Sequence, residues 1–315
     1  MSFDFCGNEN MVSLLNNIVE HRRFSHAYLF YGEEGVGKKT IARQFAQAIL
    51  CKNQNKPCME CDSCKKFLTK NHPDYFEIGM DSSKGKQGFS VSDARKLIED
   101  AYIKPNEGSY KIFLLNNVDT LLGASANTLL KTLEEPPKHV IFLLISGSRS
   151  GILETISSRC VPVGVYPVES EICFNEIKNR FADENEKQLQ LVSQLCEGSI
   201  GRAIFYLDTS MGREALSISE KLLQAYFDNN ELRFLQAVAP LEDSLELSLE
   251  VFKCFLSRVR VFMTQRIKDE NNLNVGLLNN VDKVVECVEH SKKILISNGN
   301  KKLTICRLCA EVFQK

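Results

Sequence analysis

A glycine-rich loop between two apolar segments restricts the possible folds of this chain more than any other stretch. The loop YGEEGVGKKT follows the apolar run HAYLFY at residues 26–31 and leads into KKTIARQFAQAIL at residues 38–50, whose apolar side chains recur at helical spacing. Its glycines and first lysine are Gly32, Gly35, Gly37 and Lys38. In a strand–loop–helix unit, backbone amides and the helix N-terminus can bind phosphate groups. The pattern predicts a parallel α/β domain with a phosphate-binding loop, the alternative being a tight glycine turn without a ligand.

The residue after Lys38 departs from the pattern of loops that hydrolyse nucleotides. Such loops have Ser or Thr at this position, because its hydroxyl group binds Mg²⁺. Here the position is Lys39, whose ammonium group repels a metal ion, and Thr40 comes one residue late, about 100° further around the helix. The sequence therefore predicts phosphate binding without efficient metal-assisted chemistry.

A second departure follows the apolar run KIFLL at residues 111–115. A carboxylate at the end of a neighbouring strand usually holds Mg²⁺, and an adjacent Glu activates water. Asn116 and Asn117 occupy these places, and an amide has no charge with which to bind a hard cation or to accept a proton. Asp119 is interpreted as the cap of the next helix. Both departures indicate that hydrolysis is lost, and binding of ATP or ADP at the loop stays open.

Further apolar runs alternate with helical patterns as far as residue 168. HVIFLLIS at residues 139–146 and CVPVGVYPV at residues 160–168 complete a series of buried strands, and Pro136 and Pro137 end the helix before the first of them. Beyond residue 169 the apolar spacing is helical throughout. We predict an α/β domain at residues 1–166, a small helical domain at residues 167–207 and an all-α domain at residues 208–315.

Four of the 12 cysteines are clustered at metal-ligand spacing. They are Cys51, Cys58, Cys61 and Cys64. Four thiolates at this spacing can surround Zn²⁺ as a tetrahedron, whereas a redox C-x-x-C motif has two cysteines. We predict a structural zinc module at residues 51–68 and interpret the other eight cysteines as reduced thiols.

The charge balance argues against a chain that grips duplex DNA alone. The 39 Lys and Arg residues are matched by 40 Asp and Glu residues, a net charge of −1, whereas proteins that bind a duplex by themselves carry a basic excess. No apolar run approaches the ~20 residues that span a bilayer, and the N-terminal residues lack the pattern of a signal peptide. We expect a cytoplasmic protein that acts near nucleic acid only within a larger assembly.

Six motifs together resemble the AAA+ clamp-loader subunits of bacterial replication. They occur in the order of that family as HAYLFYGEEGVGKK, the four-cysteine insert, HPDYFEI, NTLLKTLEEPP, TISSRC and GSIGRA. The combination of LLKTLEEPP with a later Ser-Arg-Cys is highly specific, and the resemblance extends over nearly the whole chain. It implies an AAA+ domain of the P-loop type, a helical lid domain and a helical collar domain through which subunits assemble.

The resemblance also implies roles for single residues. ATP-hydrolysing gamma/tau members of the family have a Thr and an Asp-Glu pair where this chain has Lys39, Asn116 and Asn117, which implies a subunit without intrinsic ATPase activity. Arg159 matches the arginine finger, which acts on the ATP of a neighbouring subunit. Arg202 matches the second sensor, and Ser146 lies near the first.

The implied partners are those of a five-subunit clamp loader. They are the gamma/tau and delta subunits and, through the complex, the sliding clamp and primed DNA, with no membrane involved. A divergent gamma/tau-type ATPase is the nearest alternative. A stand-alone ATP-dependent DNA-remodelling enzyme and a zinc-dependent DNA-binding module are more distant ones, because the acid pair and a basic excess are both missing.

Overall fold

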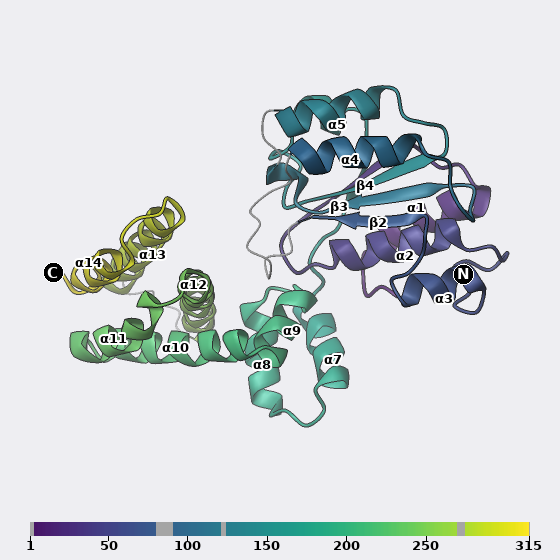
Figure 1. Ribbon diagram of the computed structural model, residues 1–315. Helices are drawn as coiled ribbons and strands as arrows, with labels where there is room; N and C mark the ends of the chain where they lie inside the picture. The colour runs from purple at the N-terminus through teal and green to yellow at the C-terminus, as the bar shows by residue number, and fades with distance from the viewer. Residues whose placement is uncertain (1–2, 80–90, 121–123, 270–274, 315) are drawn as a thin grey trace. The chain divides into compact units, whose positions relative to one another are not determined.

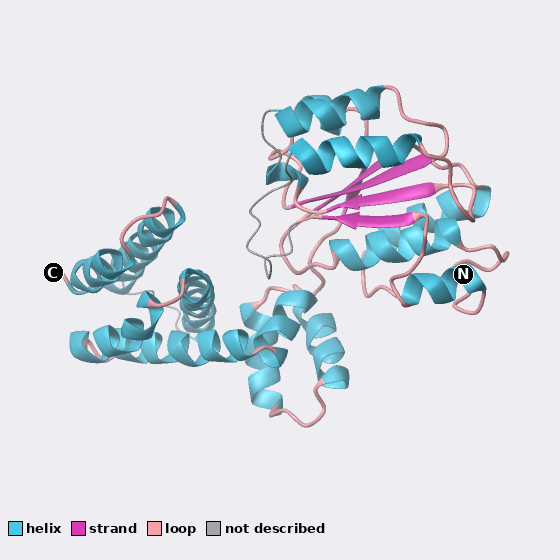
Figure 2. Ribbon diagram, in the orientation of Figure 1, coloured by secondary structure: helices cyan, strands magenta, loops and turns pink. Residues whose placement is uncertain are grey.

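A computed structural model describes residues 3–79, 91–120, 124–269 and 275–314. The chain divides into two compact units, Met1–Ile172 and Cys173–Lys315. The first is an α/β domain and the second is built from helices (Figures 1 and 2). The sequence-based prediction of this fold class is thereby confirmed.

The first unit is organised around a five-stranded parallel sheet. Its strand order is β2-β3-β4-β1-β5, with β1 (Ala27–Tyr31), β2 (Tyr75–Ile78), β3 (Lys111–Leu115), β4 (Val140–Ser146) and β5 (Val161–Gly164). The strand β1 lies between β4 and β5, pairing with β4 through Ala27 and Phe142 and with β5 through Tyr28 and Val161. Because all strands are parallel, their carboxyl ends lie at the same end of the sheet, and the glycine loop follows β1 at that end.

Helices cover both faces of the sheet, which explains why the strands are continuous apolar runs. Every residue of β3 and β4 is buried. Side chains alternate between the faces: Tyr28 of β1 packs against the layer of α1 (Glu9–His21) and α2 (Lys38–Leu50). Its neighbour Leu29 packs against the layer of α4 (Val91–Tyr102) and α5 (Ala124–Glu134). Figure 2 shows the two helical layers on opposite sides of the strands.

Three short elements carry residues of the candidate sites. The helix α3 (Asp62–Leu68) follows the cysteine-rich segment, the 3₁₀ helix η2 (Val118–Thr120) follows β3, and α6 (Glu154–Ser157) precedes β5. Ile156 of α6 is buried against the α4–α5 layer, so this short helix is held by the core.

The second unit contains only helices in its described part, residues 173–269 and 275–314. They are α7 (Ser170–Arg180), α8 (Glu186–Leu195), α9 (Ile200–Asp208), α10 (Ser210–Phe227), α11 (Glu231–Val238), η3 (Ala239–Glu242), α12 (Leu245–Asp269), α13 (Val275–Ile296) and α14 (Lys301–Phe313). The helices α8 and α9 pack against α12 and α10. Residues 173–315 therefore form one compact unit, and separate domains at residues 167–207 and 208–315 stay a prediction. The described helices are all too short or too polar to cross a membrane.

Candidate functional site

The glycine loop adopts a backbone that needs its glycines. Gly32, Gly35 and Gly37 have φ values of 150°, 81° and 94°, which other residues rarely adopt. A Cβ atom on Gly32 would lie 2.0 Å from the carbonyl oxygen of Val165, and one on Gly37 would lie 2.8 Å from the ring of Phe5. The loop is therefore closely packed between the end of β5 and the N-terminal segment, as a tight strand-to-helix turn requires.

Lys38, the predicted phosphate ligand, folds back onto its own loop. Its Nζ atom donates hydrogen bonds to the carbonyl oxygens of Gly32 at 2.7 Å and Glu33 at 2.5 Å. Burial lowers the pKa of Lys38, while the nearby carboxylates of Glu34, Asp119 and Glu33 act to raise it. The carboxylates of Glu33, Glu34 and Asp119 thus offset part of the positive charge that Lys38 would present to a phosphate group.

Lys39 forms an ion pair with Glu77, a residue that the sequence analysis missed. Glu77 lies on β2, and its carboxylate also accepts hydrogen bonds from Nε and Nη2 of Arg43 at 2.9 and 2.7 Å. The Nδ2 atom of Asn116 lies 3.4 Å from the Oε1 atom of the same carboxylate. Burial acts to raise the pKa of Glu77, but the hydrogen bonds from Lys39 and Arg43 outweigh it and lower the pKa.

In this cluster the ammonium group of Lys39 lies at the carboxyl end of the sheet, where the Mg²⁺ ion of an ATPase is expected. Lys39, Thr40, Arg43 and Asn116 line the same cavity of about 770 Å³. Two cations and one carboxylate meet there, and the nearest amide is neutral, so the donor set does not suit Mg²⁺, which prefers carboxylate and water oxygens. Thr40 is exposed on this side of α2.

Asp119 is not the helix cap that the sequence suggested. It lies inside η2, and its Oδ2 atom accepts hydrogen bonds from the backbone amide of Gly147 at 2.9 Å and the hydroxyl of Ser146 at 3.3 Å. Ser146 is fully buried at the end of β4, and its single hydroxyl proton is shared between Asp119 and the carbonyl oxygen of Ser148, which lies 2.7 Å away. The two residues therefore join the ends of β3 and β4, an arrangement that local sequence patterns do not reveal.

Arg159, the predicted arginine finger, follows α6 and is partly exposed. Its Nη1 atom donates to the carbonyl oxygen of Thr155 at 2.7 Å, and its Nη2 atom donates to Oε1 of Glu134 at 2.9 Å. The next residue, Cys160, is buried, which raises the pKa of its thiol to about 12. Cys160 packs with the α4–α5 layer, whereas the helix that carries Lys38 belongs to the other face of the sheet. The structure thus does not bring Arg159 together with the loop through any described contact of the first unit.

Arg202 belongs to the second unit. It lies on α9, where its Nη2 atom donates to the hydroxyl of Tyr206 at 2.9 Å and its guanidinium lies 5.7 Å from the centre of the Tyr206 ring. This i, i+4 pair holds the arginine along its own helix. The predicted second-sensor residue and the loop are thus carried by different units.

The four predicted metal ligands converge. The sulfur atoms of Cys51, Cys58, Cys61 and Cys64 all lie within 4.8 Å of one another, with 4.0 Å between Cys51 and Cys61 and 3.9 Å between Cys58 and Cys64. Sulfurs that are each ~2.3 Å from a tetrahedral zinc ion are ~3.8 Å apart. The donor set and its geometry therefore fit a Zn²⁺ ion.

Backbone amides also point at the sulfur atoms. The amide of Cys61 donates to the Cys58 sulfur at 3.3 Å, and the amide of Cys64 donates to the Cys61 sulfur at 3.5 Å. Burial acts to raise the pKa of Cys61, but hydrogen bonds from backbone amides and the neighbouring thiols outweigh it and lower the pKa to about 6. Such bonds favour the thiolate form that a metal requires.

A chain of buried hydrogen bonds joins this cysteine cluster to the sheet. The hydroxyl of Ser63, which lies between Cys61 and Cys64, donates to the carbonyl oxygen of Leu50 at 2.8 Å and lies 2.9 Å from Nε2 of His72. The Nδ1 atom of His72 accepts from the amide of Asp74 at 3.1 Å, so Nε2 carries the ring proton and donates to Ser63. Burial lowers the pKa of His72, which keeps the ring neutral.

Asp74 continues this chain towards the start of β3. Its buried carboxylate accepts hydrogen bonds from the backbone amides of Asn106, Glu107 and Gly108 at 2.5, 2.8 and 2.9 Å. Burial acts to raise the pKa of Asp74, but these three amides outweigh it and lower the pKa. The HPDYFEI motif thus serves to fix the loop before β3.

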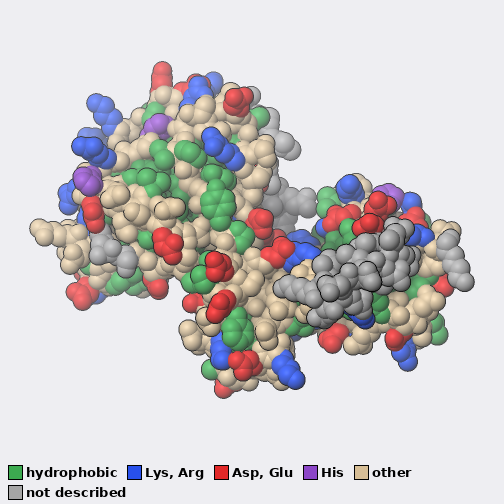
Figure 3. All heavy atoms as spheres, turned by 180° about the vertical axis from the view of Figure 1, so that it is seen from behind, with side chains coloured by type: hydrophobic (Ala, Val, Ile, Leu, Met, Phe, Trp, Pro, Cys, Tyr) green, Lys and Arg blue, Asp and Glu red, His purple; other side chains and the backbone are tan. Residues whose placement is uncertain are grey.

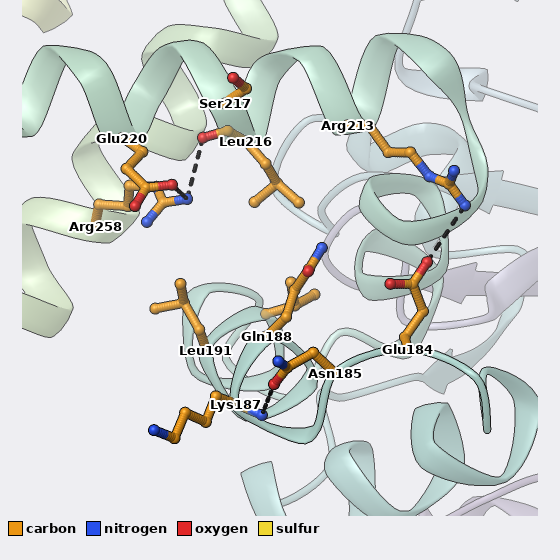
Figure 4. A pocket seen from close by; sticks show the side chains of 11 residues that line it. Glu184, Asn185, Lys187, Gln188, Leu191, Arg213, Leu216, Ser217, Glu220 and Arg258 are labelled. Carbon is orange, nitrogen blue, oxygen red and sulfur yellow. Dashed lines mark hydrogen bonds and ion pairs between the residues drawn. The ribbon is translucent and has the colours of Figure 1, made fainter.

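The helical unit has a cavity of about 600 Å³ between α8, α10 and α12 (Figure 4). Arg258 of α12 lies at one end, where it is 7% exposed. It donates from Nε to the hydroxyl of Ser219 at 2.9 Å and from Nη2 to the carbonyl oxygen of Leu216 at 3.0 Å. Arg213 and Glu184 form a looser ion pair of 3.5 Å at the other end. Arg258 therefore ties α12 to α10 in the core of this unit.

The surface agrees with the balanced charge of the chain. On the face of the first unit seen in Figure 3, acidic and basic side chains are interspersed and hydrophobic side chains gather near the middle. That face offers no broad basic area of the kind that duplex-binding proteins present.

The sequence of this chain is similar to those of DNA polymerase III subunits. A sequence profile of the family described as "DNA polymerase III, delta subunit" matches residues 7–169. DNA polymerase III subunit gamma of Buchnera aphidicola subsp. Baizongia pistaciae is 34% identical over 227 residues, which cover 70% of this chain and 60% of that protein. DNA polymerase III subunit tau of Salmonella typhimurium is 31% identical over 256 residues, which cover 78% of this chain and 39% of that protein. The chain thus spans less than two thirds of the length of these relatives.

A solved structure supports the fold. The DNA polymerase III gamma subunit-related protein of Thermotoga maritima superposes with a TM-score of 0.54 at 15% identity, covering 95% of this chain and 98% of that one. At this level of identity the likeness concerns the fold alone. Since the family profile matches more than half of the sequence, the chain belongs to the DNA polymerase III delta-subunit family of AAA+ clamp-loader proteins.

Proposed function

We propose that this chain is the delta-prime subunit of the DNA polymerase III clamp loader, a subunit that does not hydrolyse ATP itself. The single observation that carries this proposal is the ion pair of Lys39 with Glu77 beside Asn116. It places a cation and a neutral amide where an ATPase needs a hydroxyl and a carboxylate for Mg²⁺. The family membership supports the setting, since a clamp loader combines subunits of this fold.

The role that we assign to the chain is to supply Arg159 to the ATP site of a neighbouring motor subunit. An arginine delivered in this way neutralises the charge that develops on the transferred phosphoryl group and is worth ~10³–10⁵ in rate. Its partly exposed position after α6, held by Thr155 and Glu134, supports this role, because a finger must reach beyond its own subunit. The gamma/tau and delta subunits are the proposed partners, with the sliding clamp and primed DNA as targets of the whole complex.

We also propose that Cys51, Cys58, Cys61 and Cys64 hold a structural zinc ion. Zinc would cross-link the segment between α2 and α3 without an open coordination position for chemistry. The sulfur distances and the two amide-to-sulfur hydrogen bonds support this assignment.

The proposal is tested with the reconstituted complex and with the isolated chain. Arg159→Ala should assemble normally and lower the DNA-stimulated ATPase rate at the one motor site that it serves at least ~10³-fold, whereas Arg180→Ala, a change of an exposed arginine on α7, should leave the rate unchanged. The isolated chain should not turn ATP over. Full ATPase activity of the complex with Arg159→Ala would show that the finger lies elsewhere.

The alternative, a divergent gamma/tau-type ATPase, is favoured by the names of the relatives that are 31% and 34% identical. Turnover by the isolated chain distinguishes the two functions. If the isolated chain hydrolyses ATP and Lys38→Ala abolishes that activity, the chain is a motor subunit and the delta-prime proposal is wrong.

A further inference from the structure

Two sequence motifs that lie 25 residues apart meet at one hydrogen-bonded ion pair. Arg159 of TISSRC donates from Nη2 to Oε1 of Glu134 at 2.9 Å, and Glu134 is the first glutamate of LEEPP. On the other side of the guanidinium, Nη1 donates to the carbonyl oxygen of Thr155 at 2.7 Å. The side chain is thus fixed at both of its terminal nitrogens, by α5 on one side and by α6 on the other.

The fold gives Glu134 an unusual place for a carboxylate. It is the last residue of α5, which is followed by Pro136 and Pro137. A negative charge at a helix C-terminus is unfavourable, because the carbonyl groups there carry partial negative charge. Leu133, 1% exposed, anchors this turn in the core, so the backbone at Glu134 is fixed. The carboxylate thus starts from a fixed backbone position at the end of α5, where a neighbouring cation offsets the unfavourable charge.

The contacts leave the arginine able to bind a further anion. A guanidinium group has five N–H donors. The described hydrogen bonds of Arg159 use Nη1 and Nη2 and do not involve Nε. An arginine binds a phosphate most strongly with two parallel N–H groups. The Nε hydrogen and the second hydrogen of Nη2 therefore remain as donors for a phosphate while Glu134 and Thr155 keep their contacts.

We propose that Glu134 is a positioning residue for Arg159, which it holds in the orientation that reaches the phosphate of a neighbouring subunit. This inference rests on the proposed function of Arg159. A long arginine side chain has many rotamers, and ordering it only on contact would weaken its effect on the transition state. Glu134 and Thr155 order it beforehand.

The test is a double-mutant cycle in the reconstituted clamp loader with its motor subunits. Glu134→Ala, Glu134→Gln, Arg159→Ala and the double variant Glu134→Ala/Arg159→Ala are compared with the unaltered complex for kcat and KM of ATP. Glu135→Ala is the matched control, since Glu135 is the adjacent exposed glutamate and has no ion pair among those that the structure describes. Melting temperature and gel filtration of each complex report on folding and assembly.

Glu134→Ala should lower kcat at the motor site that Arg159 serves about ten- to a hundredfold with little change in KM, because it misplaces a group that acts in the transition state. Glu134→Gln, which keeps an oxygen acceptor, should recover part of that loss. In the Arg159→Ala background, Glu134→Ala should have no further effect, because it acts only through Arg159.

The other outcomes separate this inference from the function on which it rests. If Arg159→Ala is slow while Glu134→Ala matches the unaltered complex, Arg159 is the finger and Glu134 does not position it. If the two changes multiply in the double variant, Glu134 acts apart from Arg159 and the inference is wrong. If Arg159→Ala itself has no effect, the proposed function is wrong.

Discussion

The ammonium group of Lys39 and the guanidinium group of Arg43 share the single carboxylate of Glu77. Arg43 lies one helical turn after Lys39 on α2. Glu77 faces both side chains from β2, the edge strand of the sheet. The cluster thus joins α2 to the edge strand β2. Glu77 thus neutralises the positive charge of Lys39, the second lysine of the loop.

Replacing Lys39 by Thr should not by itself create an ATPase. Lys39→Thr restores the hydroxyl group, but Arg43 still pairs with Glu77 and Asn116 and Asn117 still lack a carboxylate. We expect no ATP turnover by the isolated single variant. The triple variant with Asn116→Asp and Asn117→Glu should gain measurable Mg²⁺-dependent turnover. Coupled-enzyme ATPase assays of both variants check this, and turnover by the single variant would show that the missing hydroxyl alone is the defect.

The cysteine cluster should contain about one zinc ion per chain in the purified protein. Cys61→Ser should abolish stoichiometric zinc and lower the melting temperature of the first unit. A loss of ~2 kcal/mol in a unit of this size corresponds to roughly 4–8 °C. The matched control is Cys306→Ser, because Cys306 is an exposed cysteine of α14. Metal analysis and calorimetry give both readouts, and equal zinc content in the two variants would contradict the assignment.

Asp74 should make the stability of the first unit depend on acid pH. Its pKa is lowered in the folded state, because burial, which acts to raise it, is outweighed by three backbone amides. The stabilisation is therefore present above the unfolded pKa of about 3.9 and is lost as the pH falls from there through the lower folded pKa. Asp74→Asn should cost about 2–4 kcal/mol at neutral pH and flatten this dependence. Urea unfolding between about pH 2 and 7 measures both effects, with Asp183→Asn, a change of an exposed aspartate, as control.

Arg258 should matter for the stability of the helical unit through its shape as well as its charge. Arg258→Ala leaves a void beside Ser219 and removes two buried hydrogen bonds, so we expect a loss of about 2–4 kcal/mol. Arg258→Met fills most of that volume and should cost clearly less, since Ser219 keeps its own hydrogen bond to Leu216. The exposed Arg233→Ala should stay within about 0.5 kcal/mol. Thermal unfolding of the three variants ranks them, and equal losses for the Ala and Met variants would mean that charge alone decides.

The features that could be predicted from the sequence depend on residues that lie close together along the chain. Leu29, Phe113 and Phe142 belong to continuous apolar runs, which are typical of strands covered on both faces. Cys58, Cys61 and Cys64 lie close in the sequence, so their spacing alone brings the sulfurs together.

The features that were missed depend on pairs distant along the chain. Glu77 lies 38 positions after Lys39, and Glu134 lies 25 positions before Arg159. Which acidic residue meets which basic residue is decided by the strand order and by the packing of α5 against α6, and no local sequence pattern shows either. The interpretation of Asp119 as a cap was wrong for the same reason, since its partners Ser146 and Gly147 come from the end of another strand.

The hydrogen-bonded chain from Ser63 through His72 to Asp74 gives the cysteine cluster a mechanical connection to the central sheet. Ser63 lies between Cys61 and Cys64, and the carboxylate of Asp74 binds the backbone amides of residues 106–108 just before β3. The cluster and the entrance to β3 should therefore open and close as one cooperative unit, with amide hydrogens of residues 61–64 and 106–108 exchanging together. A change at the cysteine cluster would then alter exchange first at residues 106–108, where the chain enters β3, and not at the glycine loop.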